Sequence, residues 1–151
     1  MNRFTVTRRV AVLLMTIAIA GAACGGAGDT GDAVGQTVRI RCDSIHQSAC
    51  AARLGEREVA LTIHPRPVKT MEDLTFEVTV SGDTPPGTPY IDLNMEAMDM
   101  GPNRVELKPL ENGRWTGSGV IVRCPSGKRT WVAAVTVPSV GTAEFVFDVV
   151  H

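Results

Sequence analysis

The chain has 151 residues, which suits one ordinary domain and excludes large multidomain enzymes. Lys and Arg number 15 against 16 Asp and Glu, so the formal net charge is −1, and only 21% of positions are charged. This composition supports neither a nucleic-acid-binding basic surface nor a disordered acidic tail. Because 44% of the residues are hydrophobic, the chain can bury a core.

The N-terminus has the pattern of an export signal. Three Arg within the first nine residues precede an uncharged apolar stretch, residues 10–23, which ends in small residues before Cys24. As a helix this stretch would rise only about 21 Å, less than the ~30 Å hydrocarbon core of a bilayer. We therefore predict a signal peptide over residues 1–23 rather than a permanent spanning helix.

Cys24 is predicted to carry a lipid. The small residues before it and the Gly pair after it are typical of a bacterial lipobox, in which the thiol is diacylated and the Cys becomes the new N-terminus. The alternative is a plain signal peptide with an incidental Cys, because Gly21 stands where a lipobox usually has an aliphatic residue. Two or more acyl chains hold a protein stably on a bilayer. We therefore expect an extracytoplasmic domain that is anchored to a membrane surface of the bacterial cell envelope.

Residues 24–36 are predicted to form the lipidated end and a flexible tether. Residues 25–36 contain five Gly and almost no apolar side chains, and random-coil scaling gives them an end-to-end distance of roughly 20 Å. Removal of the signal peptide takes away three Arg and no acidic residue, so the exported chain is more acidic than the whole. The folded domain is expected to cover residues 37–151.

The rest of the chain alternates apolar and polar residues in short segments. Leu74, Phe76 and Val78 share one parity and the polar Thr75 and Glu77 take the other, as in a half-buried strand. Clusters of Gly and Pro separate the segments. Strands are expected over residues 37–42, 58–64, 74–80, 90–98, 104–108, 115–123, 131–137 and 143–149. This pattern predicts an all-β fold, an immunoglobulin-like β-sandwich of about seven to eight strands, with a short helical turn in residues 44–54.

Motifs of catalytic sites are scarce. The sequence contains no HExxH, GxSxG, P-loop or GxGxxG motif, and its three His are far apart. Ser118 lies in Gly-Ser-Gly inside an expected strand, without the strand-turn-helix context that exposes a catalytic Ser. No cluster of aromatic residues indicates a small-molecule site. We therefore expect a protein that is not an enzyme.

The Cys count limits the disulfide pattern. With Cys24 acylated, Cys42, Cys50 and Cys124 remain in an oxidising compartment, so at most one intramolecular disulfide can form. We favour Cys42 with Cys50, because a ring this small closes easily. The alternative is that Cys124 pairs with one of them in a staple across the sandwich. An unpaired Cys124 is either a soft ligand or redox-active thiol, or an inert buried thiol.

Three Met form a cluster, since Met95, Met98 and Met100 fall within six residues. In a regular strand Met95 has the buried parity, whereas Met98 and Met100 have the polar one, so two thioethers would point outward together. Thioethers are soft ligands that select Cu(I). The alternative is a bulge near residues 99–101 that returns these Met to the core, where Met commonly fills gaps.

Three stretches between residues 58 and 150 carry a family resemblance. They are PRPVKTM leading into LTFEVTVSG, then MEAMDMGPNRVEL, then GRWTGSGVIVRCPSGKRTWVAAVTV. Their most specific features are a Met-x-Met-Gly turn and a strand that begins Gly-x-Trp. The stretches resemble the YtkA-like/FixH-like family of exported immunoglobulin-like domains. Its better-known members are associated with copper delivery to haem-copper oxidases or with copper tolerance, as are the similar CopC-like sandwiches.

The resemblance implies copper as the bound metal. It implies Met95, Met98 and Met100 as candidate ligands, and Cys124 and His64 as weaker ones. It also implies copper-handling or oxidase-assembly proteins as partners. The sequence lacks the His-rich pattern of a Cu(II) site, and it has a lipid anchor in place of the spanning helix of FixH-like proteins.

Two functions are carried forward from the sequence. The first is a membrane-anchored periplasmic copper-handling accessory or chaperone that binds Cu(I) through the Met cluster. The alternative is a non-enzymatic interaction module of an envelope protein complex. Neither function involves nucleic acid.

Overall fold

A computed structural model describes residues 35–96, 98 and 100–151 of the chain. The predicted signal peptide, the predicted lipid site Cys24 and most of the predicted tether lie outside the described residues. The strands of the described part all fall within the predicted domain, residues 37–151.

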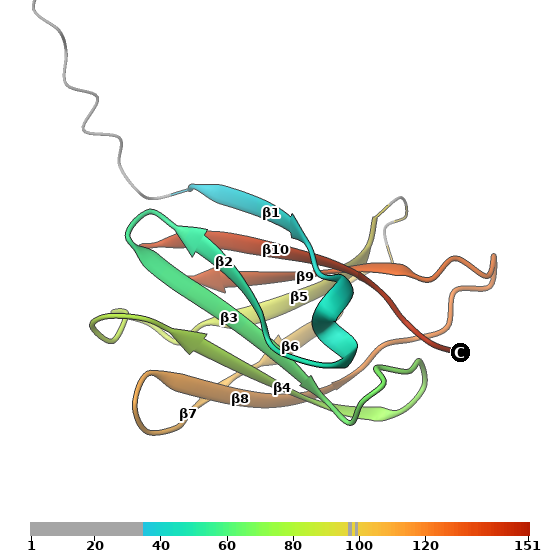
Figure 1. The fold of residues 1–151 in the computed structure, drawn as a ribbon. Coiled ribbons are helices and arrows are strands. Elements are labelled where there is room, and N and C mark those ends of the chain that lie inside the picture. Colours follow the sequence, from blue (N-terminus) through green and yellow to red (C-terminus); the bar gives the residue numbers. More distant parts are fainter. Residues whose placement is uncertain (1–34, 97, 99) are drawn as a thin grey trace, which may run out of the picture. The chain divides into compact units, whose positions relative to one another are not determined.

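In the described part of the chain, ten strands form two sheets of five that face each other (Figure 1). The first sheet has the order β1-β10-β9-β5-β6 and the second has the order β2-β3-β4-β8-β7. The strands are β1 (Thr37–Arg41), β2 (Cys50–Leu54), β3 (Arg57–His64), β4 (Asp73–Val80), β5 (Tyr90–Met95), β6 (Arg104–Glu106), β7 (Lys108–Pro109), β8 (Arg114–Val120), β9 (Thr130–Val137) and β10 (Gly141–Asp148). β1 and β10 are parallel, and the other paired strands are antiparallel. The all-β sandwich predicted from the sequence is confirmed.

The core lies between the two sheets and follows the predicted parity. In β4, Leu74, Phe76, Val78 and Val80 are buried while the residues between them are exposed or half-buried. Phe76 from the second sheet and Trp131 and Phe145 from the first are 0% exposed. Burial of each large apolar side chain contributes about 1.5–3 kcal/mol, so this shared layer stabilises the pairing of the sheets.

Residues 44–54 were expected to contain a helical turn, and this expectation is only partly right. A 3-10 helix covers Asp43–His46, but Cys50–Leu54 is the strand β2. Its Ala, Arg and Leu residues favour a helix intrinsically. Pairing with β3 overrides this preference, because it lets alternate residues of β2 enter the core.

Residues 104–108 were expected to form one strand, and the structure divides them between the sheets. β6 pairs with β5 in the first sheet, and β7 pairs with β8 in the second. The crossing chain lies against two Gly of β8. A Cβ added at Gly117 would lie 2.5 Å from the Glu106 carbonyl oxygen, and one at Gly119 would lie 2.7 Å from Cγ2 of Val105. The Gly-Ser-Gly sequence is thus explained by close packing.

We predict that Gly117→Ala destabilises the fold by about 1–3 kcal/mol, because the added methyl group meets a backbone oxygen that cannot rotate away. Ser118→Ala is the matched control, since Ser118 is exposed on the same strand, and it should change stability by less than about 0.5 kcal/mol. Urea unfolding followed by Trp fluorescence measures both. Equal stability of the two variants would contradict the close approach.

Candidate functional site

The candidate ligands collect at one end of the sandwich. β1 begins at Thr37, opposite Thr142 near the start of β10, so the chain enters the domain at the other end. Met95 lies opposite Trp131, which in turn lies opposite Phe147 near the end of β10. We call the end formed by residues 42–49, 65–72, 96, 98, 100–103 and 121–129 the distal end; it lies on the right in Figure 1.

Two of the three clustered Met face one depression at the distal end. β5 ends at Met95, and the backbone N–H of Met98 donates to the Met95 carbonyl over 3.5 Å in an isolated bridge. Met95 and Met98 line an open depression together with Asn94 and Glu96. Met95 is 6% exposed and Met98 is 39% exposed, so the depression is lined by one accessible Met and one buried Met.

The third Met does not point outward as expected. Met100 is half-buried and packs against the hydrophobic core. The prediction assumed a regular strand over residues 90–98, whereas β5 ends at Met95 and the chain turns. The parity argument therefore fails beyond Met95, and core packing, the alternative left open by the sequence, describes Met100.

The weaker candidate ligands lie apart from this depression. His64 is the last residue of β3 in the second sheet, where it is exposed opposite Thr75. Cys124 follows β8 in a loop of the distal end, and neither residue lines the depression. Within residues 35–96, 98 and 100–151 no group of three or more His, Cys, Asp and Glu is placed to hold a metal ion. The depression itself is lined by two thioether residues, Met95 and Met98, with Glu96 and Asn94 beside them.

Glu96 is a residue of the site that the sequence analysis did not single out. Its side chain lines the same depression as Met95 and Met98, and it also lines a second depression with Lys128 and Arg129. The one feature of the sequence that could have indicated Glu96 as a site residue is its position inside the Met-Glu-Ala-Met motif. Its ion-pair partner, Arg39, is 57 positions away in the sequence.

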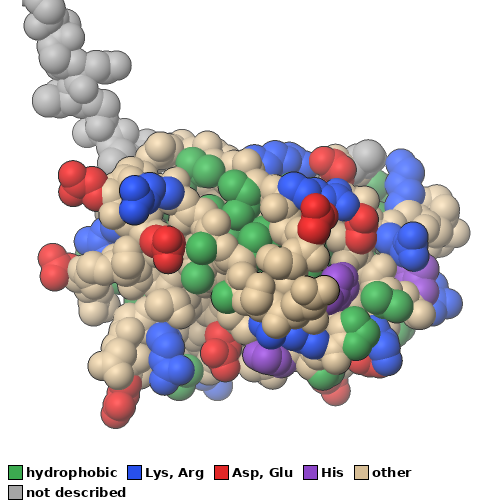
Figure 2. All heavy atoms as spheres, viewed as in Figure 1, with side chains coloured by type: hydrophobic (Ala, Val, Ile, Leu, Met, Phe, Trp, Pro, Cys, Tyr) green, Lys and Arg blue, Asp and Glu red, His purple; other side chains and the backbone are tan. Residues whose placement is uncertain are grey.

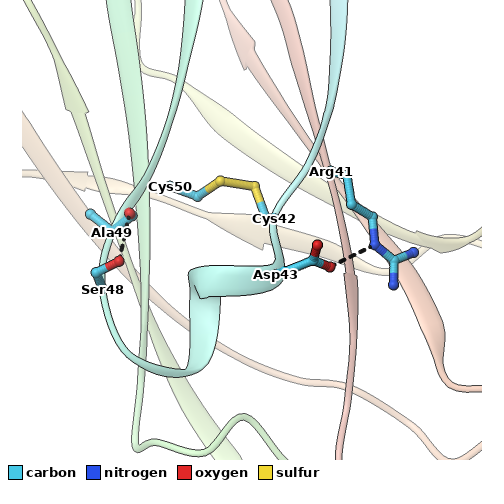
Figure 3. Close-up of a disulfide and its surroundings, with 6 residues drawn as sticks. All are labelled: Arg41, Cys42, Asp43, Ser48, Ala49 and Cys50. Carbon is cyan, nitrogen blue, oxygen red and sulfur yellow. Dashed lines mark hydrogen bonds and ion pairs between the residues drawn. A yellow bond between two sulfur atoms is a disulfide. The ribbon is translucent and has the colours of Figure 1, made fainter.

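The favoured disulfide is confirmed. Cys42 and Cys50 are bonded, with their Cα atoms 6.0 Å apart (Figure 3). The bond closes the loop that carries the 3-10 helix, whose Ile45 is 0% exposed and belongs to the core. Cys124 is a free thiol, so the alternative of a staple across the sandwich is wrong.

The Cys124 thiol lies in a loop that stabilises its thiolate. The Cys124 sulfur is 3.0 Å from the Ser126 hydroxyl oxygen, and the residue is only 2% exposed. The Ser126 hydroxyl makes the largest contribution to lowering the pKa of this thiol; desolvation opposes it. The backbone N–H groups of Ser126 and Lys128 and the charge of Lys128 lower the pKa further.

We predict that Ser126→Ala raises the pKa of the Cys124 thiol, because the substitution removes the largest stabilising contact of the thiolate. The measurement is the ultraviolet absorbance of the thiolate against pH, in the full chain with Cys24→Ser so that Cys124 is the free thiol. Ser118→Ala, a distant hydroxyl deletion, is the control. An unchanged midpoint in Ser126→Ala would show that the hydroxyl is not the cause.

The three His are brought to the distal end, but two of them make structural hydrogen bonds. The His46 Nδ1 accepts from the Val68 N–H over 3.0 Å, and its Nε2 lies 2.8 Å from the Asp148 carbonyl oxygen. The His151 Nδ1 lies 3.2 Å from the Thr70 hydroxyl. Since both ring nitrogens of His46 are engaged, this residue ties the 3-10 helix to its neighbours and offers no free nitrogen to a metal.

Comparison with known proteins adds no relative, since no protein-family model and no curated protein matches the chain. In the described part of the chain, no helix has the length and apolar character needed to cross a membrane.

Proposed function

We propose that the protein is a membrane-anchored, extracytoplasmic copper-handling accessory that binds Cu(I) through the thioethers of Met95 and Met98. The observation that carries this proposal is that both side chains line one open depression at the distal end. Soft sulfur ligands select Cu(I) over harder cations. The resemblance to the YtkA-like/FixH-like family supports the same function.

The geometry of the depression suits a carrier better than a permanent metal centre. Two thioethers leave positions around Cu(I) open, so a ligand from a receiving protein can bind before the metal leaves. Met98 is 39% exposed, which makes this residue reachable from solvent. Met100, next along the chain and packed against the core, stays a third candidate ligand, and Cys124 and His64 stay weaker ones.

We predict that Met98→Leu weakens Cu(I) binding at least tenfold while the melting temperature stays close to that of the wild type. Leu keeps the apolar volume, at a cost usually under about 1.5 kcal/mol, but it has no sulfur. Competition with a colorimetric Cu(I) chelator, on the full chain in mild detergent, measures the affinity.

Met71→Leu is the matched control, because Met71 is 66% exposed and does not line the depression. It should leave the affinity unchanged. The copper function would be abandoned if the wild type held no Cu(I) against a weak competitor, or if Met98→Leu bound it equally well.

The anchor is the second part of the proposal. Acylation of Cys24 would hold the domain at the membrane, and the tether would join the domain at Thr37, at the end of the sandwich opposite the Met pair. The thioether depression would then be accessible to a partner rather than covered by the attachment point.

We expect Cys24→Ser to release the protein from the membrane fraction, because the acyl chains supply the binding energy at about 0.8 kcal/mol per buried CH₂. Fractionation followed by immunoblotting measures the distribution, and Cys124→Ser is the control for loss of a thiol. Retention of the Cys24→Ser protein on membranes would exclude the lipid as the only anchor.

A second candidate function, an interaction module, has its own observation. Met71, Val122 and Val150 are 66%, 37% and 38% exposed at the distal end. The segments that carry these residues are adjacent. The backbone N–H of Met71 donates to the Ile121 carbonyl, and the backbone N–H of Thr70 donates to the Val150 carbonyl. Figure 2 shows hydrophobic side chains in green beside His in purple and Lys and Arg in blue at this end.

The charges beside this apolar surface indicate the chemistry of a partner. Arg123 follows Val122, and the carbonyl of Arg129 accepts a hydrogen bond from Val149. Neither Arg makes an ion pair within 4.0 Å among the described residues. The matching partner is an envelope protein with an apolar patch flanked by acidic residues. This function stands if Cu(I) binding fails.

A further inference from the structure

An ion pair spans the outer face of the first sheet and ends at Glu96, in the turn that follows β5, whose described residues are 96, 98 and 100–103 and which we call the Met turn. Arg39 points outward from the edge strand β1, and its Nη2 lies 3.0 Å from Oε1 of Glu96, the residue after Met95. Its Nη1 lies 3.2 Å from Oε2 of Glu144. β10 and β9 lie between β1 and β5, so the two elements are about 14 Å apart at the usual strand spacing.

Apolar side chains lie along the same face. Val132 and Val146 are opposite each other in β9 and β10, and their parity points them away from the core. They are nevertheless only 7% and 4% exposed. Long Arg side chains bury their stems over apolar surface while their charges stay in water, and the outward Arg39 and Arg41 of β1 are placed to do so.

Two backbone hydrogen bonds at Glu96 and Met98, both described residues of this turn, are long. The Met98 N–H donates to Met95, and the Glu96 N–H donates to Thr130, each over 3.5 Å. Both distances are at the weak limit for a hydrogen bond. The contact between the Glu96 carboxylate and Arg39, at 3.0 Å, is shorter than either of these two backbone hydrogen bonds.

We propose that Arg39 is a positioning residue of the Cu(I) site, a role that rests on the proposed function. By holding Glu96, Arg39 fixes the turn so that the thioethers of Met95 and Met98 face one depression before the metal arrives. A pre-organised ligand pair loses less conformational entropy on binding. The same contact links β1, the first strand after the tether, to the metal site.

The test measures Cu(I) affinity by chelator competition on the full chain in detergent. Arg39→Gln is expected to weaken binding two- to fivefold, because half-exposed ion pairs hold their partners only modestly. Glu96→Gln should cause the same loss, and the double variant should lose no more than either single one, since each already breaks the pair. Arg39→Lys should recover part of the affinity.

Arg41→Gln is the matched control. Arg41 is the next outward Arg of β1, but it pairs with Asp43 and Asp148, at 2.9 and 2.7 Å, instead of Glu96. It should leave the Cu(I) affinity unchanged. The salt dependence of Cu(I) binding is a second readout, which a merely structural role would not give. Raised salt screens the ion pair, so it should weaken Cu(I) binding by the wild type toward the affinity of Arg39→Gln. The affinity of Arg39→Gln itself should not change with salt.

The outcomes separate this role from the function on which it rests. If the wild type binds Cu(I) but Arg39→Gln binds it equally well, or Arg41→Gln loses as much, the positioning role is wrong and the copper function stands. If the wild type holds no Cu(I), the copper function fails and the positioning role fails with it.

Discussion

The burial of two apolar sheet faces against each other is the constraint on which the rest of the structure depends. Phe76 and Leu61 from one sheet and Trp131 and Phe145 from the other are 0% exposed in this layer. The inward-facing positions of the strands must therefore be apolar, which leaves the inner layer of the described domain almost free of polar side chains. Polar and reactive side chains are therefore placed on the outer faces and at the two ends of the sandwich. Among the described residues, the Met thioethers, the free thiol and the His lie at the distal end.

The sequence predicts most of the strands because alternation is local information. Phe76 and its neighbours identify β4 without knowledge of any partner strand. β2 is not predictable in this way, since its Ala-rich sequence becomes a strand only through pairing with β3. The division of β6 from β7 depends on the close approach of the chain to Gly117, and a tertiary contact of this kind leaves no periodic signal.

In the candidate site, too, the features that depend on residues close in sequence are predictable, and those that depend on distant residues are not. The Cys42–Cys50 bond is predictable because the two residues are eight positions apart, and the Met cluster is visible because it is contiguous. The outward direction of Met100 is mispredicted because the end of β5 depends on a turn. The pairing of Glu96 with Arg39 follows from the order of strands in the first sheet, which no local spacing encodes.

The direction of β1 sets the end of the sandwich at which the chain enters the domain. Strands of this sandwich have up to eight residues, and at about 3.3 Å per residue they separate the two ends by roughly 26 Å. The chain enters the first sheet at Thr37, and the open Met depression and the apolar surface of Met71, Val122 and Val150 both lie at the opposite, distal end of the sandwich. A partner docked on that apolar surface would be at the same end as Met98, which is 39% exposed. Both proposed functions would therefore use one end of the domain, and the proposed copper transfer would need docking of the kind that the second proposal describes.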